Sequence, residues 1–452
     1  MESNLYKNII FIFLVSLTLY SCSLNSASTV ETSDDATISA FSINDNDSSE
    51  NASSAVFTID DEKNIIYNVD SLPYNTRIDS LIPSITFESS DGFIINDSLT
   101  YDYYTTIKAI DFKNKVKVTN IASDGETKKT YYVDLRVHKI DPYQYVWSQL
   151  TSQIGADVFE NQKAVLYKNA LHFYTNSGIN TYLYTSTDGA TWVKKDVNGL
   201  PADIVFLNNI DVFNNQILLL YGTEIYSTTD GINWSKLTTD NVYKYKSLIC
   251  EFQNKLFAVG QNISTGNYSI ISSTNATSWN EESILPTDFP VTGFAATTFK
   301  PKYGNKKMLV VGGNDKNGSI LNTRWSTEDG MYWVNLKNAK SSFGPLSNAG
   351  VAYYGSRLLL FDTYYSNTSL KYIRNSLDYG LTWAKADTTQ NRPHDLYKIR
   401  EKASVVLNPT TQTLYVIGGK YSKMDEGFTV LSDVWQVKVN YYKFKPEEWS
   451  DY

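Results

Sequence analysis

Histidine and cysteine are scarce in this chain, which limits the kinds of site that it can build. Only three histidines and two cysteines occur among 452 residues. His138, His172 and His394 are isolated and lack the spacing of metal ligands, so we predict no zinc site. Cys250 stands between apolar neighbours with no histidine close in sequence, so we expect a buried small side chain and no nucleophile.

Other signatures of catalysis are also missing. The chain has no Gly-x-Ser-x-Gly, no phosphate loop and no dinucleotide fingerprint. The run from Asp45 to Ser49 resembles the start of a calcium loop. However, Glu50 stands where that loop needs glycine, and Val56 where it needs a glutamate. We therefore expect a polar loop there, and we predict no metal and no cofactor.

Charge is sparse and mostly acidic. Charged residues make up 19% of the chain, the net charge is −8 and the pI is about 5.1. Nucleic acids need basic patches on their partners, so the balance argues against nucleic-acid binding. A neutral ligand or a protein partner fits this composition better.

Helical periodicity is also rare, and strand-forming residues are common. The chain has 34 tyrosines together with many valines, isoleucines and threonines, a bias typical of strands. Apart from the N-terminal segment, no capped helical stretch stands out. We predict an all-β protein, long enough for two domains.

The only markedly apolar run lies at the N-terminus. Ile9–Tyr20 is too short to span a bilayer stably, and Lys7 is the only positive side chain before it. It ends in Leu19-Tyr20-Ser21-Cys22, which resembles a bacterial lipobox.

The lipobox resemblance implies a signal peptide over residues 1–21 and cleavage before Cys22. It also implies a diacylglyceryl thioether and an acylated amino group on Cys22, which together anchor firmly in a membrane. The expected location is the outer membrane, on its periplasmic or extracellular face. The alternative is an ordinary cleaved signal with an incidental cysteine. Residues 22–35 are polar and predict a disordered tether.

Residues 36–138 predict a first domain. Short apolar groups recur along it, and it ends in the period-2 strand Tyr131–Val137 after a turn at Ser123–Glu126. About seven short strands in some 100 residues predict an immunoglobulin-like β-sandwich.

An octet with the pattern Ser-x-Asp-x-Gly-x-Thr-Trp organises the rest of the chain. Its full form is Ser376–Trp383, and aligned copies end at four earlier tryptophans. An acidic or amide side chain starts a turn, glycine supplies the positive φ, and tryptophan packs under the turn. The predicted turn residues are Asp188, Gly189, Trp192, Asp230, Gly231, Trp234, Asn275, Trp279, Asp329, Gly330, Trp333, Asp378, Gly380 and Trp383.

The octet resembles the Asp-box (BNR) repeat of β-propeller proteins. Only the fifth copy matches in full; three others have the acid next to the glycine, and the third has Asn275 and Ala276. In that family the box marks the fold and is not the active site, so we predict a structural role. The tryptophans recur every 42 to 54 residues, as four-stranded propeller blades do.

The sixth unit resembles a kelch blade. Gly418-Gly419 and the run from Leu431 to Trp435 resemble kelch motifs, as does Gly312-Gly313 in an earlier unit. We therefore expect a six-bladed propeller over residues 143–442, followed by a tail at 443–452. A seventh blade is possible if the interval between Trp279 and Trp333 hides a unit. The segment Val146–Leu150 is predicted to pair with strands from the C-terminal end and to complete the sixth blade.

Asp-box propellers include sialidases, which bind a carboxylate with three arginines. The arginines after residue 138 are Arg324, Arg357, Arg374, Arg392 and Arg400. None lies in the Arg-Ile/Leu-Pro motif of sialidases, and we expect Arg324 and Arg374 to be rim residues. A sialidase is not favoured.

The chain as a whole resembles uncharacterised bacterial surface lipoproteins with a sandwich and an Asp-box/kelch propeller. This predicts a non-enzymatic binding module for a glycan or protein at the propeller face. Loose candidates for stacking on sugars are Tyr353, Tyr354, Tyr364, Tyr365, Tyr441 and Tyr442.

Two alternatives remain. The first is a divergent glycoside hydrolase or lyase with carboxylates and a tyrosine at the propeller centre; two carboxyl groups about 5–10 Å apart in a central pocket would favour it. The second is a purely structural subunit of a surface complex.

Overall fold

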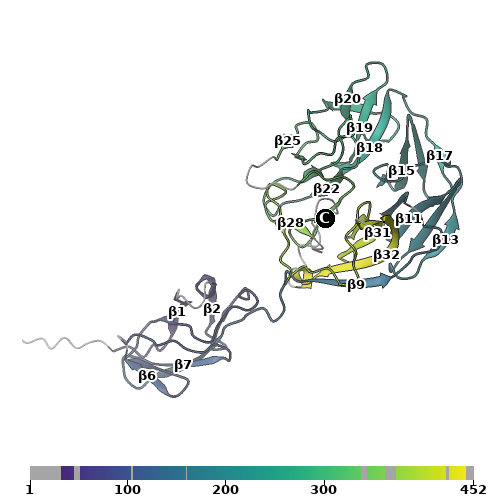
Figure 1. The fold of residues 1–452 in the computed structure, drawn as a ribbon. Coiled ribbons are helices and arrows are strands. Elements are labelled where there is room, and N and C mark those ends of the chain that lie inside the picture. The colour runs from purple at the N-terminus through teal and green to yellow at the C-terminus, as the bar shows by residue number, and fades with distance from the viewer. Residues whose placement is uncertain are drawn as a thin grey trace, which may run out of the picture. The chain divides into compact units, whose positions relative to one another are not determined.

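The computed structural model describes residues 32–44, 51–102, 105–158, 160–336, 344–361, 373–423 and 427–443. Almost all regular structure in these ranges is strand, with only short 3-10 turns at Ala52–Ser54 and Asn440–Lys443. The prediction of an all-β protein is confirmed. The chain forms two compact units, 1–139 and 140–452, shown in Figure 1. The expected signal peptide, Cys22, residues 45–50 and most of the C-terminal tail lie outside the described residues.

The first unit contains two sheets. One is the antiparallel pair β1-β4, and the other has the order β2-β3-β8-β7-β5-β6. Strands β3 and β8 are parallel, whereas the other paired strands of this unit are antiparallel. The strands are β1 (Ile38–Ile43), β2 (Phe57–Asp60), β3 (Ile65–Asn68), β4 (Pro83–Phe87), β5 (Gly92–Ile95), β6 (Leu99–Asp102), β7 (Val116–Ile121) and β8 (Lys128–Asp134).

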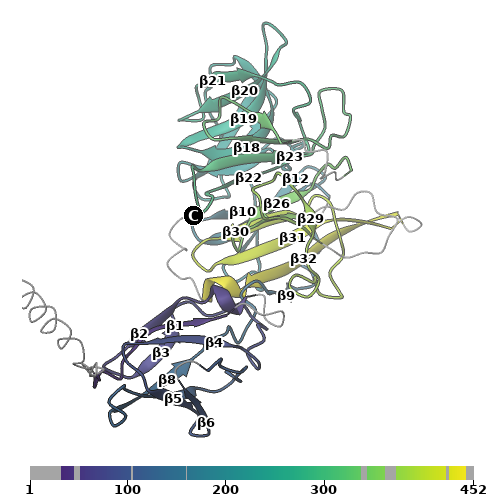
Figure 2. The same cartoon turned by 90° about the vertical axis from the view of Figure 1, so that its left-hand side faces the viewer.

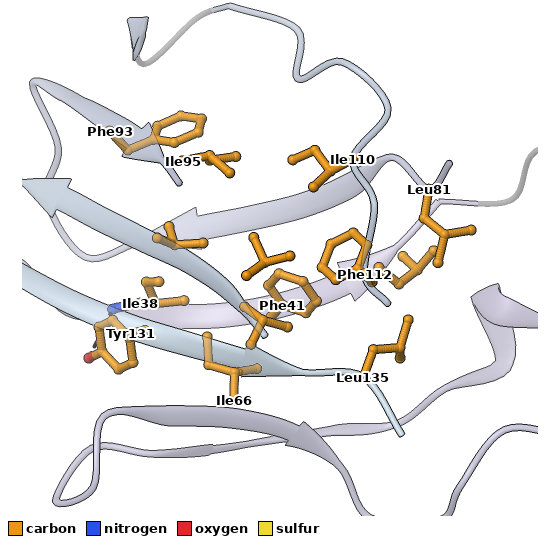
Figure 3. Close-up of a cluster of buried hydrophobic side chains, with 14 of the residues drawn as sticks. Ile38, Phe41, Ile66, Leu81, Phe93, Ile95, Ile110, Phe112, Tyr131 and Leu135 are labelled. Carbon is orange, nitrogen blue, oxygen red and sulfur yellow. Dashed lines mark hydrogen bonds between the residues drawn. The ribbon is translucent and has the colours of Figure 1, made fainter. Parts of the chain in front are cut away.

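Both sheets contribute to one core. Ile38 and Phe41 come from the two-stranded sheet, and Ile66, Ile95 and Tyr131 from the six-stranded sheet. Figure 3 shows these side chains converging in one cluster. Strand β7 alternates buried and half-buried positions, as a strand with one face on a core should.

The second unit contains six four-stranded antiparallel sheets among the described residues. Their strand orders follow the chain, except that the last sheet takes β9 as its fourth strand. Sheet 1 consists of β10 (Gln162–Tyr167), β11 (Ala170–Ser177), β12 (Asn180–Ser186) and β13 (Val193–Asp196). Sheet 2 consists of β14 (Ile210–Phe213), β15 (Gln216–Tyr221), β16 (Glu224–Thr228) and β17 (Ser235–Lys236). Sheet 3 consists of β18 (Tyr243–Phe252), β19 (Lys255–Asn262), β20 (Tyr268–Ser273) and β21 (Asn280–Ile284).

Sheets 4 to 6 have the same plan. Sheet 4 consists of β22 (Ala295–Phe299), β23 (Lys307–Val311), β24 (Arg324–Thr327) and β25 (Val334–Asn335). Sheet 5 consists of β26 (Gly350–Tyr353), β27 (Leu358–Phe361), β28 (Arg374–Ser376) and β29 (Ala384–Lys385). Sheet 6 consists of β30 (Ser404–Asn408), β31 (Thr413–Lys423), β32 (Gly427–Val439) and β9 (Tyr145–Thr151). The interval between Trp279 and Trp333 contains strands of sheets 3 and 4.

The first strands of the six sheets contact one another in a circle. Strand β10 contacts β14, and the contacts continue through β18, β22, β26 and β30 back to β10. Each of these strands lies at one edge of its own sheet. We call them the inner strands.

Six apolar clusters lie between neighbouring sheets. Each contains residues of two consecutive sheets, and the last joins sheet 6 to sheet 1. The tryptophan of every repeat lies in the cluster shared with the preceding sheet, as Trp234 does between sheets 1 and 2. The indole therefore packs between neighbouring sheets as well as against its own turn.

The last sheet joins the two ends of the unit. Strand β9 pairs antiparallel with β32, with Trp147 opposite Val437. The expected pairing of residues 146–150 with C-terminal strands is confirmed. Strands β31 and β32, yellow in Figure 2, are the longest in the unit at 11 and 13 residues.

The antiparallel order gives the unit two opposite faces. The turn between the first and second strands of a sheet and the turn carrying the repeat octet lie at one end, which we call the box face. The turn between the second and third strands and the connection to the next sheet lie at the other end, which we call the loop face. Hydrogen bonds tie neighbouring sheets together at the box face, for example from Asn214 Nδ2 to the Thr274 carbonyl at 2.9 Å.

Candidate functional site

The octet turns are held by a repeated set of hydrogen bonds. In the first turn the Ser186 hydroxyl donates to Asp188 Oδ1 at 2.9 Å and accepts the Gly189 N–H at 2.8 Å. The same Asp188 oxygen accepts the Thr191 N–H at 2.8 Å. Trp192 Nε1 donates to the Gly189 carbonyl at 2.9 Å. The predicted turn residues thus bond mainly within their own turn.

The set recurs in the later copies, including the degenerate third. Asn275 Oδ1 accepts the Ser278 N–H at 2.9 Å, and Ala276 adopts a φ of 64° where the other turns have glycine. At Asp230, donation from the Asn233 N–H holds the pKa of the carboxyl well below its usual range. In each of copies two to four, one residue supplies the hydroxyl, one the acid or amide, and one the positive φ. In that order they are Thr228, Asp230 and Gly231; Ser273, Asn275 and Ala276; and Thr327, Asp329 and Gly330.

The structure adds a hydroxyl to the turn residues predicted from sequence. In the first copy it belongs to Ser186, three residues before the glycine. In the fifth copy Ser376 bonds the Gly380 N–H, because Tyr379 adds one residue with a φ of 60°. The first four turns are therefore one residue shorter than the full Asp-box pattern.

Trp234 departs from the common set. The indole nitrogens of the other four octets donate to their own turns at 2.9 to 3.2 Å. Trp234 Nε1 is buried and has no hydrogen-bond partner among the residues that the structure describes. Its ring packs edge-on against Tyr174, at 5.7 Å between centroids.

The inner strands surround a cavity of about 320 Å³. Most of the residues that line it are aliphatic and belong to the six inner strands, although polar atoms make up the larger part of the accessible wall. The polar lining side chains are Lys163 on β10, Asp211 on β14, Cys250 on β18, and Asn208 and Asn348 at the strand approaches. Within the described residues this is the place where unlike functional groups converge, so we treat it as the candidate site.

The two charged groups of the cavity are perturbed by burial. Burial raises the pKa of Asp211 to about 6, opposed by the Val212 N–H and by Lys163. Burial also lowers the pKa of Lys163, and Asp211 opposes that shift. Both side chains keep partial contact with solvent although protein surrounds them, as expected for groups that line a cavity.

Neither charged group has a side-chain partner within the described residues. Asp211 Oδ1 accepts the adjacent Val212 N–H at 2.8 Å, and the Lys163 ammonium has no hydrogen bond or ion pair. The two charges influence each other electrostatically without forming a contact ion pair. Charged groups in such surroundings are costly unless something pairs with them.

Cys250 differs from expectation in one respect. It is only partly buried and lines the cavity, where we expected a buried small side chain. Burial, reinforced by nearby Asp211, raises the pKa of its thiol far above the usual range, so the reactive thiolate is suppressed.

Other residues singled out from sequence lie inside the fold. Arg324, expected at the rim, is buried and donates from Nη2 to the Leu336 carbonyl at 3.2 Å. Arg400 is buried in a bidentate ion pair with Asp433, which also accepts from Trp435 Nε1 at 2.7 Å. Neither arginine is among the described residues that line the cavity.

The tyrosines proposed for sugar stacking are largely unavailable. Tyr353 and Tyr354 are buried, and the Tyr354 hydroxyl donates to the Gln412 carbonyl at 2.6 Å. Tyr441 is half-buried and stacks on Tyr143, with ring centroids 5.9 Å apart. Tyr364 and Tyr365 lie outside the described residues, as does the side chain of Tyr442.

Sequence reasoning missed Lys163 and Asp211. A signal was present, because each is the one charged residue in an otherwise mostly apolar inner strand. A search of the described residues finds no group of three or more histidine, cysteine, aspartate or glutamate side chains placed to hold a metal. None of the helices in the described ranges is long and apolar enough to cross a membrane.

The fold and the comparisons define the class of protein. The second unit matches the model of a β-propeller domain, DUF6242 beta propeller domain, over residues 141–447, and the first matches the DUF6242 N-terminal domain over residues 23–135. The chain belongs to the DUF6242 family.

Comparisons with other proteins add little beyond this family. No curated protein matches the chain. A solved structure entitled "Structure of YjhT" aligns with 63% of this chain and 96% of its own, at 13% identity and a TM-score of 0.43.

Proposed function

We propose that the protein is a lipoprotein of the outer membrane that binds another protein through the loop face of its propeller. The anchor in this proposal is a lipid on Cys22, supported by the run Leu19-Tyr20-Ser21-Cys22 after a short apolar segment. The propeller in this proposal has six Asp-box and kelch-like blades, supported by the six sheets and the circle of inner-strand contacts. The first unit is an immunoglobulin-like spacer, supported by its two sheets around one core.

The observation that carries the binding proposal is the exposure of apolar side chains at the loop face. Exposed aliphatic or aromatic side chains occur in turns and connections of several sheets at this face and at the start of β32. The box face exposes others, such as Tyr303, Tyr332 and Leu377. Clusters of exposed apolar residues mark interaction sites. The exposed apolar residues of the loop face are Ile179, Val205, Val242, Ile263, Ile320, Leu396 and Phe428.

A protein partner suits these residues better than a glycan. Sugars are bound by flat aromatic faces, and only Phe428 among them is aromatic. Aliphatic side chains supply buried apolar area, as in the centres of protein interfaces. Phe428 also lies under the Lys420 ammonium, 3.8 Å from its ring centroid.

Site-specific photocrosslinking in intact cells tests the proposal. A photoreactive residue replaces Ile179 or Leu396 on the loop face, and Leu377, equally exposed on the box face, serves as the control. We expect one discrete protein adduct from the loop-face positions and none from Leu377. Equal labelling from both faces, or glycan capture on an array with no protein adduct, would contradict it.

The anchor is tested separately. Wild-type protein should incorporate a labelled fatty acid and sediment with outer membranes, whereas Cys22→Ser should do neither. If Cys22→Ser is still labelled and still sediments with membranes, Cys22 is not the attachment site.

The glycoside hydrolase or lyase remains the second candidate because Asp211, with its pKa near 6, resembles a general acid. Within the described lining of the cavity, however, Asp211 is the only carboxyl group. Two-carboxylate hydrolysis needs a second one. Turnover of a glycan that Asp211→Asn abolishes would favour the enzyme over the binding protein.

A further inference from the structure

The central cavity is lined by the inner strands and, at one end, by residues of the loop-face connections such as Asn208 and Asn348. Its volume of about 320 Å³ is at the lower end of the range for ligand pockets, about 300–1,000 Å³. Such pockets are mainly apolar with a few polar groups that fix orientation. Most residues around this cavity are aliphatic, but polar atoms make up the larger part of its accessible wall. Among them are one ammonium and one carboxyl group, on the neighbouring strands β10 and β14.

The two charges balance each other without touching. Lys163 has no hydrogen-bond or ion-pair partner among the described residues, and Asp211 is bonded only to the adjacent Val212 N–H. A direct pair would have neutralised both groups internally. Instead each keeps its bonding capacity while lying within the electrostatic range of the other.

We propose that this cavity binds a small zwitterion of the α-amino-acid class with an aliphatic side chain. The ligand carboxylate bonds the Lys163 ammonium, and the ligand ammonium bonds the Asp211 carboxylate. The ligand side chain lies beside lining residues such as Val165 and Ile249, which also pack in the clusters between sheets.

Charge pairing selects the zwitterion over simpler ions. A purely anionic ligand would pair with Lys163 and leave Asp211 unpaired beside a second negative charge. A purely cationic ligand would pair with Asp211 and leave Lys163 unpaired beside a second positive charge. Since partly buried charges are stable only when paired, a ligand with both groups satisfies the site.

Calorimetric titration of the purified full-length mature chain with leucine tests the inference. Two analogues dissect it: 4-methylpentanoate, which lacks the amine, and 3-methylbutylamine, which lacks the carboxylate. We expect leucine to bind at least about tenfold more tightly than either analogue, because only leucine makes both charge-assisted contacts.

Two variants then assign each contact. Lys163→Met should weaken leucine at least about tenfold and leave 3-methylbutylamine no weaker, while Asp211→Asn should weaken leucine similarly and leave 4-methylpentanoate no weaker. Lys244→Met and Asp196→Asn, at exposed positions on β18 and β13, are matched controls that should change nothing. Circular dichroism and thermal unfolding establish that every variant is folded.

Several results would overturn the inference. Among them are no leucine binding to folded wild-type protein, equal binding of leucine and either analogue, or unchanged leucine affinity in both cavity variants. None of these outcomes bears on the loop face, whose crosslinking is measured independently.

Discussion

At the scale of single residues, the octet turns combine a backbone requirement with a packing requirement. Gly330 has a φ of 79°, and a Cβ there would lie 2.3 Å from Phe257 Cζ in the preceding sheet. Ala276 meets the same backbone requirement with a φ of 64°, and its methyl group lies in the cluster between sheets 2 and 3. Steric space at the neighbouring sheet, in addition to φ, therefore decides where glycine is required.

Gly330→Ala should lower the free energy of unfolding by about 3 kcal/mol or more, because backbone strain and the clash with Phe257 add. Gly222→Ala is the matched control. Its φ is 63° and nothing lies within 4 Å of the added Cβ, so only about 1 kcal/mol should be lost. Urea denaturation measures both, and equal losses would show that the contact with Phe257 is unimportant.

Asp211 predicts a pH-dependent stability with a definite sign. Its pKa is about 6 in the folded protein and 3.8 as the reference, so the folded state binds the proton more tightly. Stability contributed by this group is therefore greatest below about pH 4 and is lost as the pH rises through about 6. Two other charged groups act on the pKa of Asp211: Lys163 lowers it and Glu251 raises it. The Cys250 thiol also lies within the electrostatic range of Asp211.

Asp211→Asn should accordingly stabilise the protein at about pH 8. The expected gain is only about 1 kcal/mol, because cavity water screens the Asp211 charge and because the substitution removes the attraction between Asp211 and Lys163. The gain should vanish at about pH 4, where the aspartate is protonated. Urea unfolding of both proteins across this range measures the difference. A gain of the same size at both pH values would contradict the raised pKa of Asp211.

Residue patterns predicted the octet turns but not the cavity. The spacing of acid, glycine and tryptophan is local, so turn residues such as Asp378 and Gly380 could be found without coordinates. The bonding hydroxyl, Ser186 in the first copy, was not assigned from sequence because Thr185 and Ser186 are adjacent and chemically alike. Lys163 and Asp211 are 48 residues apart and meet only because their strands are neighbours in the circle, which no local pattern specifies.

At the scale of elements, β9 determines whether the last sheet is complete. It provides the fourth strand beside β32 and comes from the opposite end of the unit. Its inner side is anchored by Trp147, whose Nε1 donates to Asn391 Oδ1 at 3.0 Å within the cluster between sheets 5 and 6. The neighbouring Val146 faces solvent, with 49% of its surface exposed.

Trp147→Ala should therefore cost about 3–5 kcal/mol of unfolding free energy, because it removes a large buried ring and leaves the Asn391 carbonyl oxygen unpaired. Val146→Ala, one residue away on the same strand, should cost less than about 1 kcal/mol. Hydrogen exchange should show faster exchange in β32 for Trp147→Ala alone. Similar losses in the two variants would mean that β9 is not held by its inner face.

Element pairing was predictable only where the sequence repeats itself. The segment 146–150 could be assigned to the last sheet because it resembles the strands that follow the octets elsewhere. The first unit has no repeat to compare. Its parallel pairing of β3 with β8 joins residues more than 60 positions apart, and short apolar groups do not specify the partner or direction of such a pair.

At the scale of the whole molecule, the two units have separate cores. The cluster around Ile66 contains residues of the first unit alone, and the six clusters of the second unit contain none of these. Cooperative unfolding follows shared buried contacts, so each unit should unfold as its own transition.

Calorimetry of two core variants tests this independence. Ile66→Ala removes a fully buried side chain of the first unit and should lower one thermal transition by roughly 10 °C or more, leaving the other in place. Leu218→Ala, fully buried in the second unit, should shift only the other transition. If either variant moved both transitions together, the units would have to share stabilising contacts, and the first could not act as a spacer that leaves the propeller's stability unchanged.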